Sequence, residues 1–266
     1  MAEDPASELR VEIDGRGVAR LTLDRAEKHN ALSAPMMDAL AQAADRLGAD
    51  PAVRAVVLAG RGRSFCAGGD LGWMMAQIEA DRAGRMAEAR RLAGCLRALN
   101  EMPKPLIAQV HGNAFGGGVG LISVCDVAIG VPEARFGLTE TRLGLIPATI
   151  GPYVLARMGE GRARRVFMSA RLFDAAEAQA LDLLARIVPA DGLDAAVEAE
   201  IAPYLSVAPG AVGAAKALAR RLGPPIDDAV IEETIARLAD VWEGPEAAAG
   251  IAAFLEKRPP PWAGPD

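Results

Sequence analysis

Two glycine-rich segments are the parts of this sequence best suited to chemistry. The first is Phe65–Leu71 (FCAGGDL) and the second is His111–Leu121 (HGNAFGGGVGL). Glycines let the backbone approach a ligand closely, and N–H groups at the start of a helix attract negative charge. Each segment follows a predicted buried strand, and ligands of open α/β sheets bind at the carboxyl ends of strands. We therefore predict that the two segments meet in a pocket of backbone N–H groups that stabilises an anionic oxygen.

The surrounding residues exclude several common uses of such a pocket. The chain has no Gly-Lys dipeptide, the glycine spacing at Gly116–Leu121 does not match the dinucleotide fingerprint, and no Gly-x-Ser-x-Gly elbow occurs. Cys66 and His111 stay open as a nucleophile pair, although a buried cysteine is usually inert. Three cysteines without paired spacing and only two histidines favour neither a disulfide framework nor a metal site.

The elements that must position these segments follow βαβ order, which predicts an α/β fold with a parallel sheet. After Pro189 the pattern is wholly helical, so we divide the chain into an α/β core (1–200) and a helical C-terminal region (201–266). Strands are expected at 18–23, 53–59, 106–110, 126–129 and 186–188. Helices are expected from Ser33 to Gly48 and at 73–100, 118–125, 174–184, 193–205, 211–222, 228–241 and 245–255, before a Pro-rich, extended tail.

Net charge and hydropathy predict whether the protein binds nucleic acid or membranes and where it is located. The net charge of −6 gives no general attraction to nucleic acid or to acidic membranes. Met1–Arg10 is acidic and polar and is not a signal peptide. The uncharged stretch 105–125 contains polar side chains and five glycines, which argues against a membrane span. We expect a soluble, cytoplasmic protein.

With these segments the sequence resembles the enoyl-CoA hydratase/isomerase (crotonase) superfamily. The resemblance is carried by Cys66–Leu71, Gly112–Gly118 and Phe136–Gly144, together with Lys28–Leu32 and Phe254–Arg258 near the two ends. It implies a crotonase-like spiral of ββα units whose C-terminal helices assemble a homotrimer or a dimer of trimers. It also implies an acyl-CoA thioester substrate, so that coenzyme A enters as part of the substrate and no separate cofactor or metal is needed.

The resemblance assigns roles to individual residues. It implies that the N–H groups of Ala67 and Gly117 hold the thioester oxygen and that Glu140 is the catalytic carboxylate. Removal of one such N–H donor typically costs about 3–4 kcal/mol of transition-state stabilisation. Trp73, Met74 and Met75 fit either the acyl pocket or the core. The positions matched to coenzyme A binding are Lys28, Ala31, Ala67, Gly68, Gly69, Asp70, Leu71, Gly117 and Lys257, of which Asp70 equally fits a helix cap.

Hydratases of the superfamily usually carry a second glutamate, three residues after the middle glycine of the triplet. That position is Gly120 here, which leaves Glu140 as the one matching carboxylate. Gly120 and the segment Glu140–Ile150 are similar to bacterial methylglutaconyl-CoA hydratases, whose branched substrates carry a distal carboxylate. A missing side chain at Gly120 would leave room for the branch. Arg142 fits either a partner for that carboxylate or a solvent-facing residue.

These features together predict an enoyl-CoA hydratase, a lyase that adds water to an enoyl thioester in fatty acid or leucine degradation. A single glutamate can deprotonate the attacking water and return a proton to the α-carbon. It can also shuttle a proton in a Δ3–Δ2 enoyl-CoA isomerase, which is the alternative enzyme. A catalytically silent acyl-CoA-binding homologue is the non-enzyme alternative, against which the retention of Glu140 argues.

Overall fold

The structure, a computed structural model, describes residues 8–264 of the 266-residue chain. Predictions for residues 1–7 and for the last two residues of the tail lie outside this range. A larger sheet has the strand order β1-β2-β3-β5-β7-β10, in which only the β1–β2 pair is antiparallel. Its strands are β1 (Leu9–Ile13), β2 (Val18–Leu23), β3 (Ala55–Gly60), β5 (Leu106–Val110), β7 (Val127–Gly130) and β10 (Arg186–Ile187). The predicted α/β class and parallel sheet are confirmed.

A second, four-stranded sheet was not predicted, because its strands have three residues each and are too short to show a hydrophobic period. In the order β4-β6-β8-β9 they are β4 (Ser64–Cys66), β6 (Asn113–Phe115), β8 (Arg135–Gly137) and β9 (Leu172–Asp174). Strands β4 and β6 pair in parallel, with Cys66 opposite Ala114. This pairing brings the two glycine-rich segments side by side.

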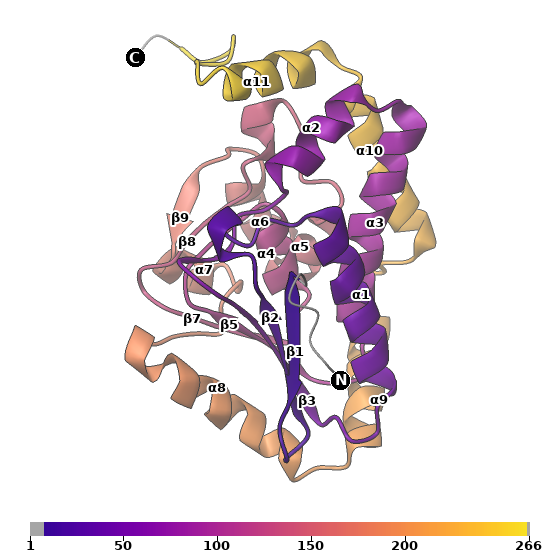
Figure 1. The fold of residues 1–266 in the computed structure, drawn as a ribbon, viewed down its shortest axis with the longest axis vertical. Helices are drawn as coiled ribbons and strands as arrows, with labels where there is room; N and C mark the ends of the chain where they lie inside the picture. Colours follow the sequence, from indigo (N-terminus) through magenta and orange to yellow (C-terminus); the bar gives the residue numbers. More distant parts are fainter. Residues whose placement is uncertain (1–7, 265–266) are drawn as a thin grey trace.

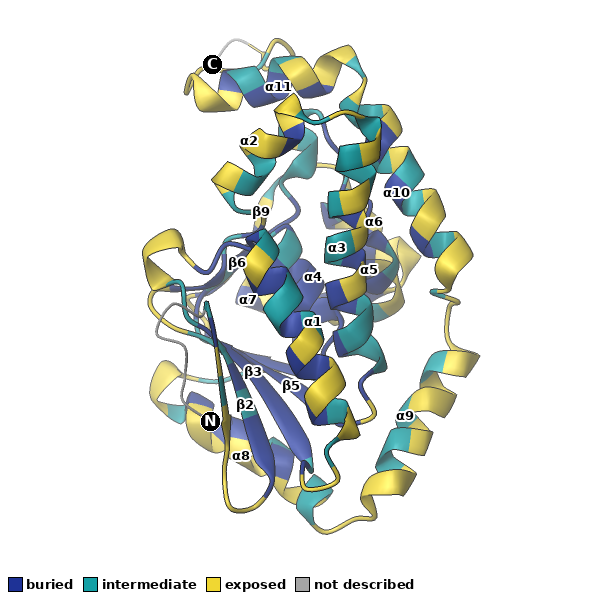
Figure 2. Cartoon of the chain, turned by 45° about the vertical axis from the view of Figure 1, so that its right-hand side comes forward, coloured by how far each residue is buried: buried dark blue, intermediate teal, exposed yellow. Residues whose placement is uncertain are grey.

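Helices surround the sheets, and Figures 1 and 2 show the larger sheet between α1 on one side and α8 on the other. Helix α1 begins after Ser33, whose side chain accepts a hydrogen bond from the Met36 N–H, as the sequence predicts for an N-cap. The helices are α1 (Ala34–Ala49), α2 (Leu71–Glu79), α3 (Arg82–Glu101), α4 (Gly117–Ser123), α5 (Gly151–Met158), α6 (Glu160–Phe167), α7 (Ala175–Ala180), α8 (Leu193–Ile201), α9 (Pro209–Leu222), α10 (Asp228–Trp242) and α11 (Pro245–Leu255).

The single helix predicted at 73–100 is wrong. The chain breaks at Ala80 and Asp81 into α2 and α3, because the Asp81 side chain accepts a hydrogen bond from the Gly84 N–H (2.8 Å) and starts a new helix. Two other helices are shorter than predicted. Helix α7 ends before Asp182, which has a positive φ of 63°, and α8 ends at Ile201, before a 3-10 turn that contains Pro203.

The helices that follow the last strand differ in where they are buried. Figure 2 shows α8 with a buried face on the sheet, and Val197 and Ile201 belong to the main core. Helix α10 packs on α3 in a small separate cluster around Ile235, and α11 packs on the turn at Glu140–Leu143. The division near residue 200 stays a prediction. No helix within residues 8–264 is long and apolar enough to cross a membrane.

Candidate active site

Main-chain hydrogen bonds join the two glycine-rich segments to their neighbours. The Leu32 N–H donates to the Gly68 carbonyl (2.7 Å), and the Asp70 N–H donates back to the Leu32 carbonyl (3.0 Å). The Gly116 N–H donates to the Gly137 carbonyl of β8 (2.9 Å). A Cβ placed on Gly68 would lie 3.7 Å from the Gly117 nitrogen, so the segments touch as predicted.

The role predicted for Ala67 as an oxyanion donor needs correction. Its N–H already donates to the carbonyl oxygen of His29 (3.0 Å), so this donor is engaged within the protein. The N–H of Gly69 has no acceptor among residues 8–264, because the bridge to Leu32 uses the groups on either side of it. Gly117 is the first residue of α4, and an N–H at that position has no partner within its own helix. Gly69 and Gly117 are therefore two donors that no acceptor within residues 8–264 engages.

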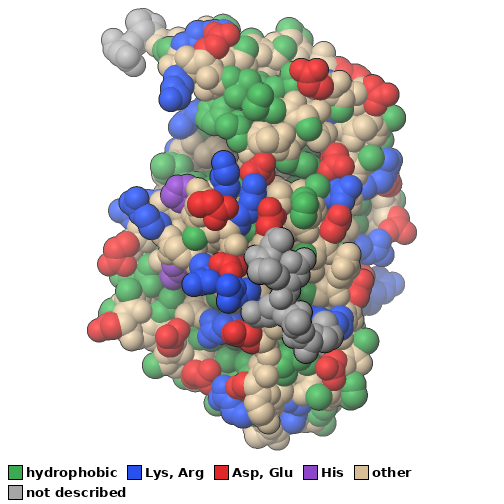
Figure 3. Space-filling view, in the orientation of Figure 1, with side chains coloured by type: hydrophobic (Ala, Val, Ile, Leu, Met, Phe, Trp, Pro, Cys, Tyr) green, Lys and Arg blue, Asp and Glu red, His purple; other side chains and the backbone are tan. Residues whose placement is uncertain are grey.

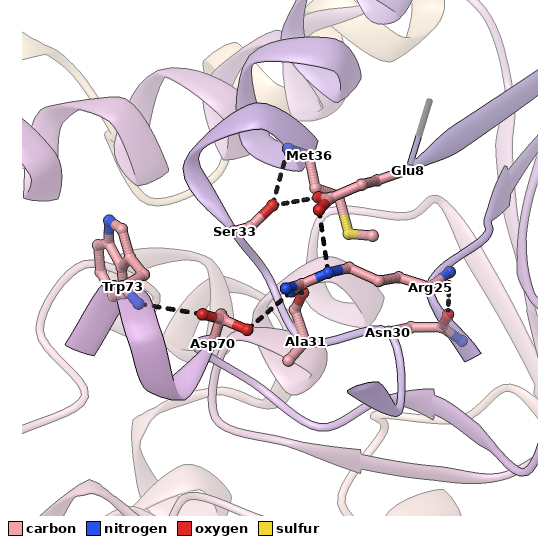
Figure 4. Close-up of polar contacts among 8 residues, drawn as sticks. All are labelled: Glu8, Arg25, Asn30, Ala31, Ser33, Met36, Asp70 and Trp73. Carbon is pink, nitrogen blue, oxygen red and sulfur yellow. Dashed lines mark hydrogen bonds and ion pairs between the residues drawn. The ribbon is translucent and has the colours of Figure 1, made fainter. Parts of the chain in front are cut away.

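A half-buried ion pair fixes the first segment (Figure 4). Arg25 donates to Asp70 (2.8 Å) and to Glu8 (2.9 Å), while the Trp73 N–H donates to Asp70 (3.0 Å) as a helix cap. Burial disfavours the charged Asp70, but the bonds from Trp73 and Arg25 outweigh it and lower the pKa of the carboxyl. Asp70 thus positions the glycine segment through its side chain. Its predicted contact with coenzyme A stays a prediction.

Glu140 begins the 3-10 turn Glu140–Leu143, directly after β8. Its Oε1 lies 3.0 Å from the Cβ position of Gly116, where the positive φ of 47° also favours glycine. Its Oε2 is buried and has no hydrogen-bond partner in the described chain. Burial raises the pKa of Glu140 to about 7. A carboxyl group with this pKa can take up and release a proton near neutral pH.

Glu140 and the two free donors line one cavity of about 340 Å³. One side, which we call the loop wall, comes from residues 67–69, 116–117 and 139–150. The other, the helical wall, comes from α2, α3, α10 and α11 and includes Trp73, Met74, Trp242 and Phe254. Within residues 8–264, five buried side chains carry a polar atom without a partner, and three of these line the cavity: Gln77, Glu140 and Thr149. Such groups normally find a partner, so the cavity is suited to a polar ligand.

The space expected beside Gly120 is already filled. A Cβ built on Gly120 would lie 2.5 Å from Cγ2 and 3.0 Å from Cβ of Ile150. Ile150 itself lines the cavity, whereas Gly120 is buried behind it. The prediction that Gly120 leaves room for a substrate branch is therefore wrong, because the side chain of Ile150 occupies that space.

The remaining predicted residues divide into those at the cavity and those away from it. Gly68 lines the cavity, and so does Arg142, whose Nη2 donates to the carbonyl of Ala170 (3.3 Å). Met75 and Leu71 lie on the exposed side of α2, where Figure 3 shows hydrophobic side chains gathered on the surface. Those that do not line the cavity also include Lys28 and Lys257, both exposed, and Ala31, which is buried and accepts a hydrogen bond from Arg25.

The open pairing of Cys66 with His111 is not formed. Burial raises the pKa of the Cys66 thiol to about 12, only partly opposed by a backbone hydrogen bond from Gly68. The His111 Nε2 contacts the Gly62 carbonyl oxygen (3.1 Å), and burial lowers the pKa of this histidine. No group of three or more metal-ligating side chains occurs in the described range.

Sequence reasoning missed several residues of this site. Asn30 is fully buried and donates to the carbonyl oxygens of Arg61 and Ser64 (both 2.8 Å), which holds the chain around β4. In the sequence, Asn30 could be noticed only as a polar residue within Lys28–Leu32, one of the segments that carry the family resemblance. Gln77 and Arg85 gave no signal, because they lie where the predicted helix is in fact broken.

Comparison with known proteins finds similar sequences and structures over nearly the whole chain. A sequence model of the family described as "Enoyl-CoA hydratase/isomerase" matches residues 14–265. A Thermus thermophilus protein provisionally named an enoyl-CoA hydratase is 36% identical over 253 residues, 94% of this chain and 99% of that protein. Mouse mitochondrial methylglutaconyl-CoA hydratase is 32% identical, over 98% of this chain and 84% of its own length. A crystal structure of an enoyl-CoA hydratase from Shewanella pealeana matches with 38% identity and a TM-score of 0.78, over 96% of both chains.

Proposed function

This chain belongs to the enoyl-CoA hydratase/isomerase family and is an enzyme of the hydratase type, and we propose that Glu140 carries its acid and base chemistry on an enoyl-CoA thioester. The observation that carries the proposal is the geometry of one cavity. It joins a carboxyl group whose pKa is raised to about 7 to two unpaired N–H donors, those of Gly69 and Gly117.

The proposed reaction needs one carboxylate. Ionised Glu140 takes a proton from a water molecule, whose oxygen attacks the β-carbon of the enoyl group. The electron pair of the double bond moves toward the thioester and forms an enolate, whose oxygen accepts hydrogen bonds from Gly69 and Gly117. Glu140 then returns the proton to the α-carbon. The product is a β-hydroxyacyl thioester, and the carboxylate is regenerated.

For the acyl group we propose a branched, methylglutaconyl-like chain. Similarity to the mouse methylglutaconyl-CoA hydratase supports this choice, as do the unpartnered polar atoms of Gln77 and Thr149 in an otherwise largely apolar cavity. The coenzyme A portion, the assembly into trimers or hexamers through the C-terminal helices, and the cytoplasmic location are further parts of the proposal, and they rest on the resemblance to the family.

An isomerase is the second candidate, and one observation favours it. Among the described residues that line the cavity, Glu140 is the only carboxylate, and one carboxylate suffices to move a proton between the α- and γ-carbons. The decisive experiment is a panel of 2-enoyl- and 3-enoyl-CoA thioesters, with the conjugated-thioester absorbance and the product mass recorded. Loss of absorbance with gain of one water is expected. A rise in absorbance from 3-enoyl substrates at unchanged mass would identify an isomerase instead.

A further inference from the structure

The helical wall of the cavity contains a polar corner, formed by Gln77 of α2 and Arg85 of α3, that the proposed chemistry does not use. Both residues line the cavity. Arg85 Nε donates to the main-chain carbonyl of Gln77 (2.8 Å), and its Nη2 donates to that of Ile78 (3.2 Å). The guanidinium carbon lies 5.5 Å from the ring centroid of Trp242, which backs it from α10. These contacts hold the guanidinium in place, and its Nη1 makes no hydrogen bond within residues 8–264.

Arg85 has no carboxylate partner in residues 8–264, and three acids on the neighbouring elements are engaged elsewhere. Asp240 and Glu243 of the α10 end both pair with Arg82 (2.7 and 2.8 Å). Glu88 of α3 accepts a hydrogen bond from an indole N–H (2.7 Å). The guanidinium therefore contacts two backbone carbonyls and an aromatic face, and no carboxylate in the described range pairs with it.

Gln77 supplies the second, independent observation. The residue is 5% exposed, and its Oε1 has no hydrogen-bond partner in the described part of the chain. Its Nε2 makes one long hydrogen bond, to the Trp73 carbonyl (3.4 Å). Rotation of the amide about its last bond exchanges the two atoms, so that Nε2 replaces Oε1. It gives up the long bond and turns Oε1 toward the Trp73 carbonyl oxygen, a cost that the bound ligand has to offset. The corner then presents N–H donors from both residues.

We propose that the polar corner binds a carboxylate at the far end of the acyl group, so that Gln77 and Arg85 select enoyl-CoA thioesters that end in a negative charge. This inference rests on the proposed function, because it assumes that the cavity holds the acyl chain. Two N–H donors and a fixed positive charge match the two oxygens and the charge of a carboxylate. An acyl group ending in a methyl group would leave both side chains unsatisfied.

The test compares binding of two unreactive saturated thioesters, 3-methylglutaryl-CoA and its terminal amide, by calorimetry. The wild-type protein should bind the carboxylate about tenfold more tightly than the amide, since a charge-assisted contact of this kind is typically worth about that factor. The isosteric Gln77→Glu variant places a negative charge beside Arg85. It should weaken binding of the carboxylate at least about tenfold and leave binding of the amide within about threefold.

Arg142→Met is the matched control, because Arg142 also lines the cavity but lies on the loop wall; it should leave the preference unchanged. Equal affinity of the wild type for both thioesters would overturn the inference, as would a preference that survives Gln77→Glu or disappears in Arg142→Met. Binding requires no turnover. A protein that prefers the carboxylate but hydrates no enoyl-CoA would therefore contradict the proposed reaction while supporting the corner, and an active hydratase without the preference would do the reverse.

Discussion

The two walls of the cavity are built in different ways. The loop wall is held by main-chain hydrogen bonds and by glycines that admit no side chain: a Cβ on Gly118 would lie 2.4 Å from the Cys66 carbonyl oxygen, and one on Gly68 would lie 2.9 Å from that of Phe115. The helical wall is made of side chains such as Met74, Leu238 and Trp242, which project from separate helices. The loop wall therefore tolerates few substitutions, whereas the helical wall can change residue by residue.

We infer from this difference that the loop wall serves catalysis and the helical wall serves substrate selection. Catalysis needs donors fixed where charge develops, and backbone groups in a hydrogen-bonded loop meet that need. Selection among acyl groups needs a surface whose shape and polarity can vary while the fold is kept. We expect substitutions on the loop wall to lower turnover of every substrate, and substitutions on the helical wall to change which substrate is preferred.

The largest effect is expected for Glu140→Gln. It removes the proton acceptor but keeps the size of the side chain, so kcat should fall about a thousandfold for all enoyl-CoA substrates. Steady-state kinetics test this, and unchanged turnover would contradict the proposed mechanism.

Thermal melting at pH 8 is the control for this variant. A raised pKa means that folding favours the protonated carboxyl, so ionised Glu140 destabilises the native state increasingly as pH rises from about 4.5 to about 7. The glutamine variant should therefore melt at the same or a higher temperature than the wild type. A lower melting temperature would attribute the lost activity to unfolding.

Gly117→Ala should have the next largest effect. The new Cβ would meet the end of the Leu32 side chain at 2.8 Å. Because Leu32 is buried and has little room to turn away, we expect part of the clash to be relieved by a shift of residue 117 and its N–H. Loss of one oxyanion donor typically lowers kcat by about a hundredfold or more. Gly94→Ala is the matched control, because Gly94 lies on α3 with open space at its Cβ position. Equal kinetics for the two variants would contradict the role of Gly117.

The activity of the wild type should fall steeply and steadily as the pH is lowered. Because the ionised form of Glu140 accepts the proton, activity should fall as pH drops below about 7 and reach roughly a hundredth of its plateau near pH 5. The measurement is kcat/KM from pH 5 to pH 8 with a buffer series of constant ionic strength. A profile that is flat through this range would show that Glu140 titrates well below 7.

The smallest effect on turnover is expected on the helical wall. Met74→Ala enlarges the cavity without touching the donors or Glu140, so kcat should change by less than about tenfold. The ratio of kcat/KM between a longer and a shorter enoyl-CoA should rise, which a competition assay measures directly. A large and uniform loss across chain lengths would remove the distinction between the two walls.

The loop wall was largely predictable from the sequence and the helical wall was not. Glycine runs after buried strands are local signals, and they predicted that the two segments meet. Which donor is free was not predictable, because the Ala67 N–H is engaged by His29, thirty-eight positions earlier in the chain. The helical wall depends on the break at Asp81, where one capping bond overrides a sequence that could continue as a helix. Gln77 and Arg85 become neighbours only through that break.

The contact between Gly120 and Ile150 also restricts the order in which substitutions at these two positions can occur. Glutamate at position 120 would collide with the isoleucine, so a second carboxylate cannot be gained by one substitution without displacing the chain around Ile150. A smaller residue at position 150 would have to come first, and that change alone opens a hole behind the cavity and destabilises the fold. The two positions are thus coupled: a carboxylate fits at position 120 only together with a change at position 150.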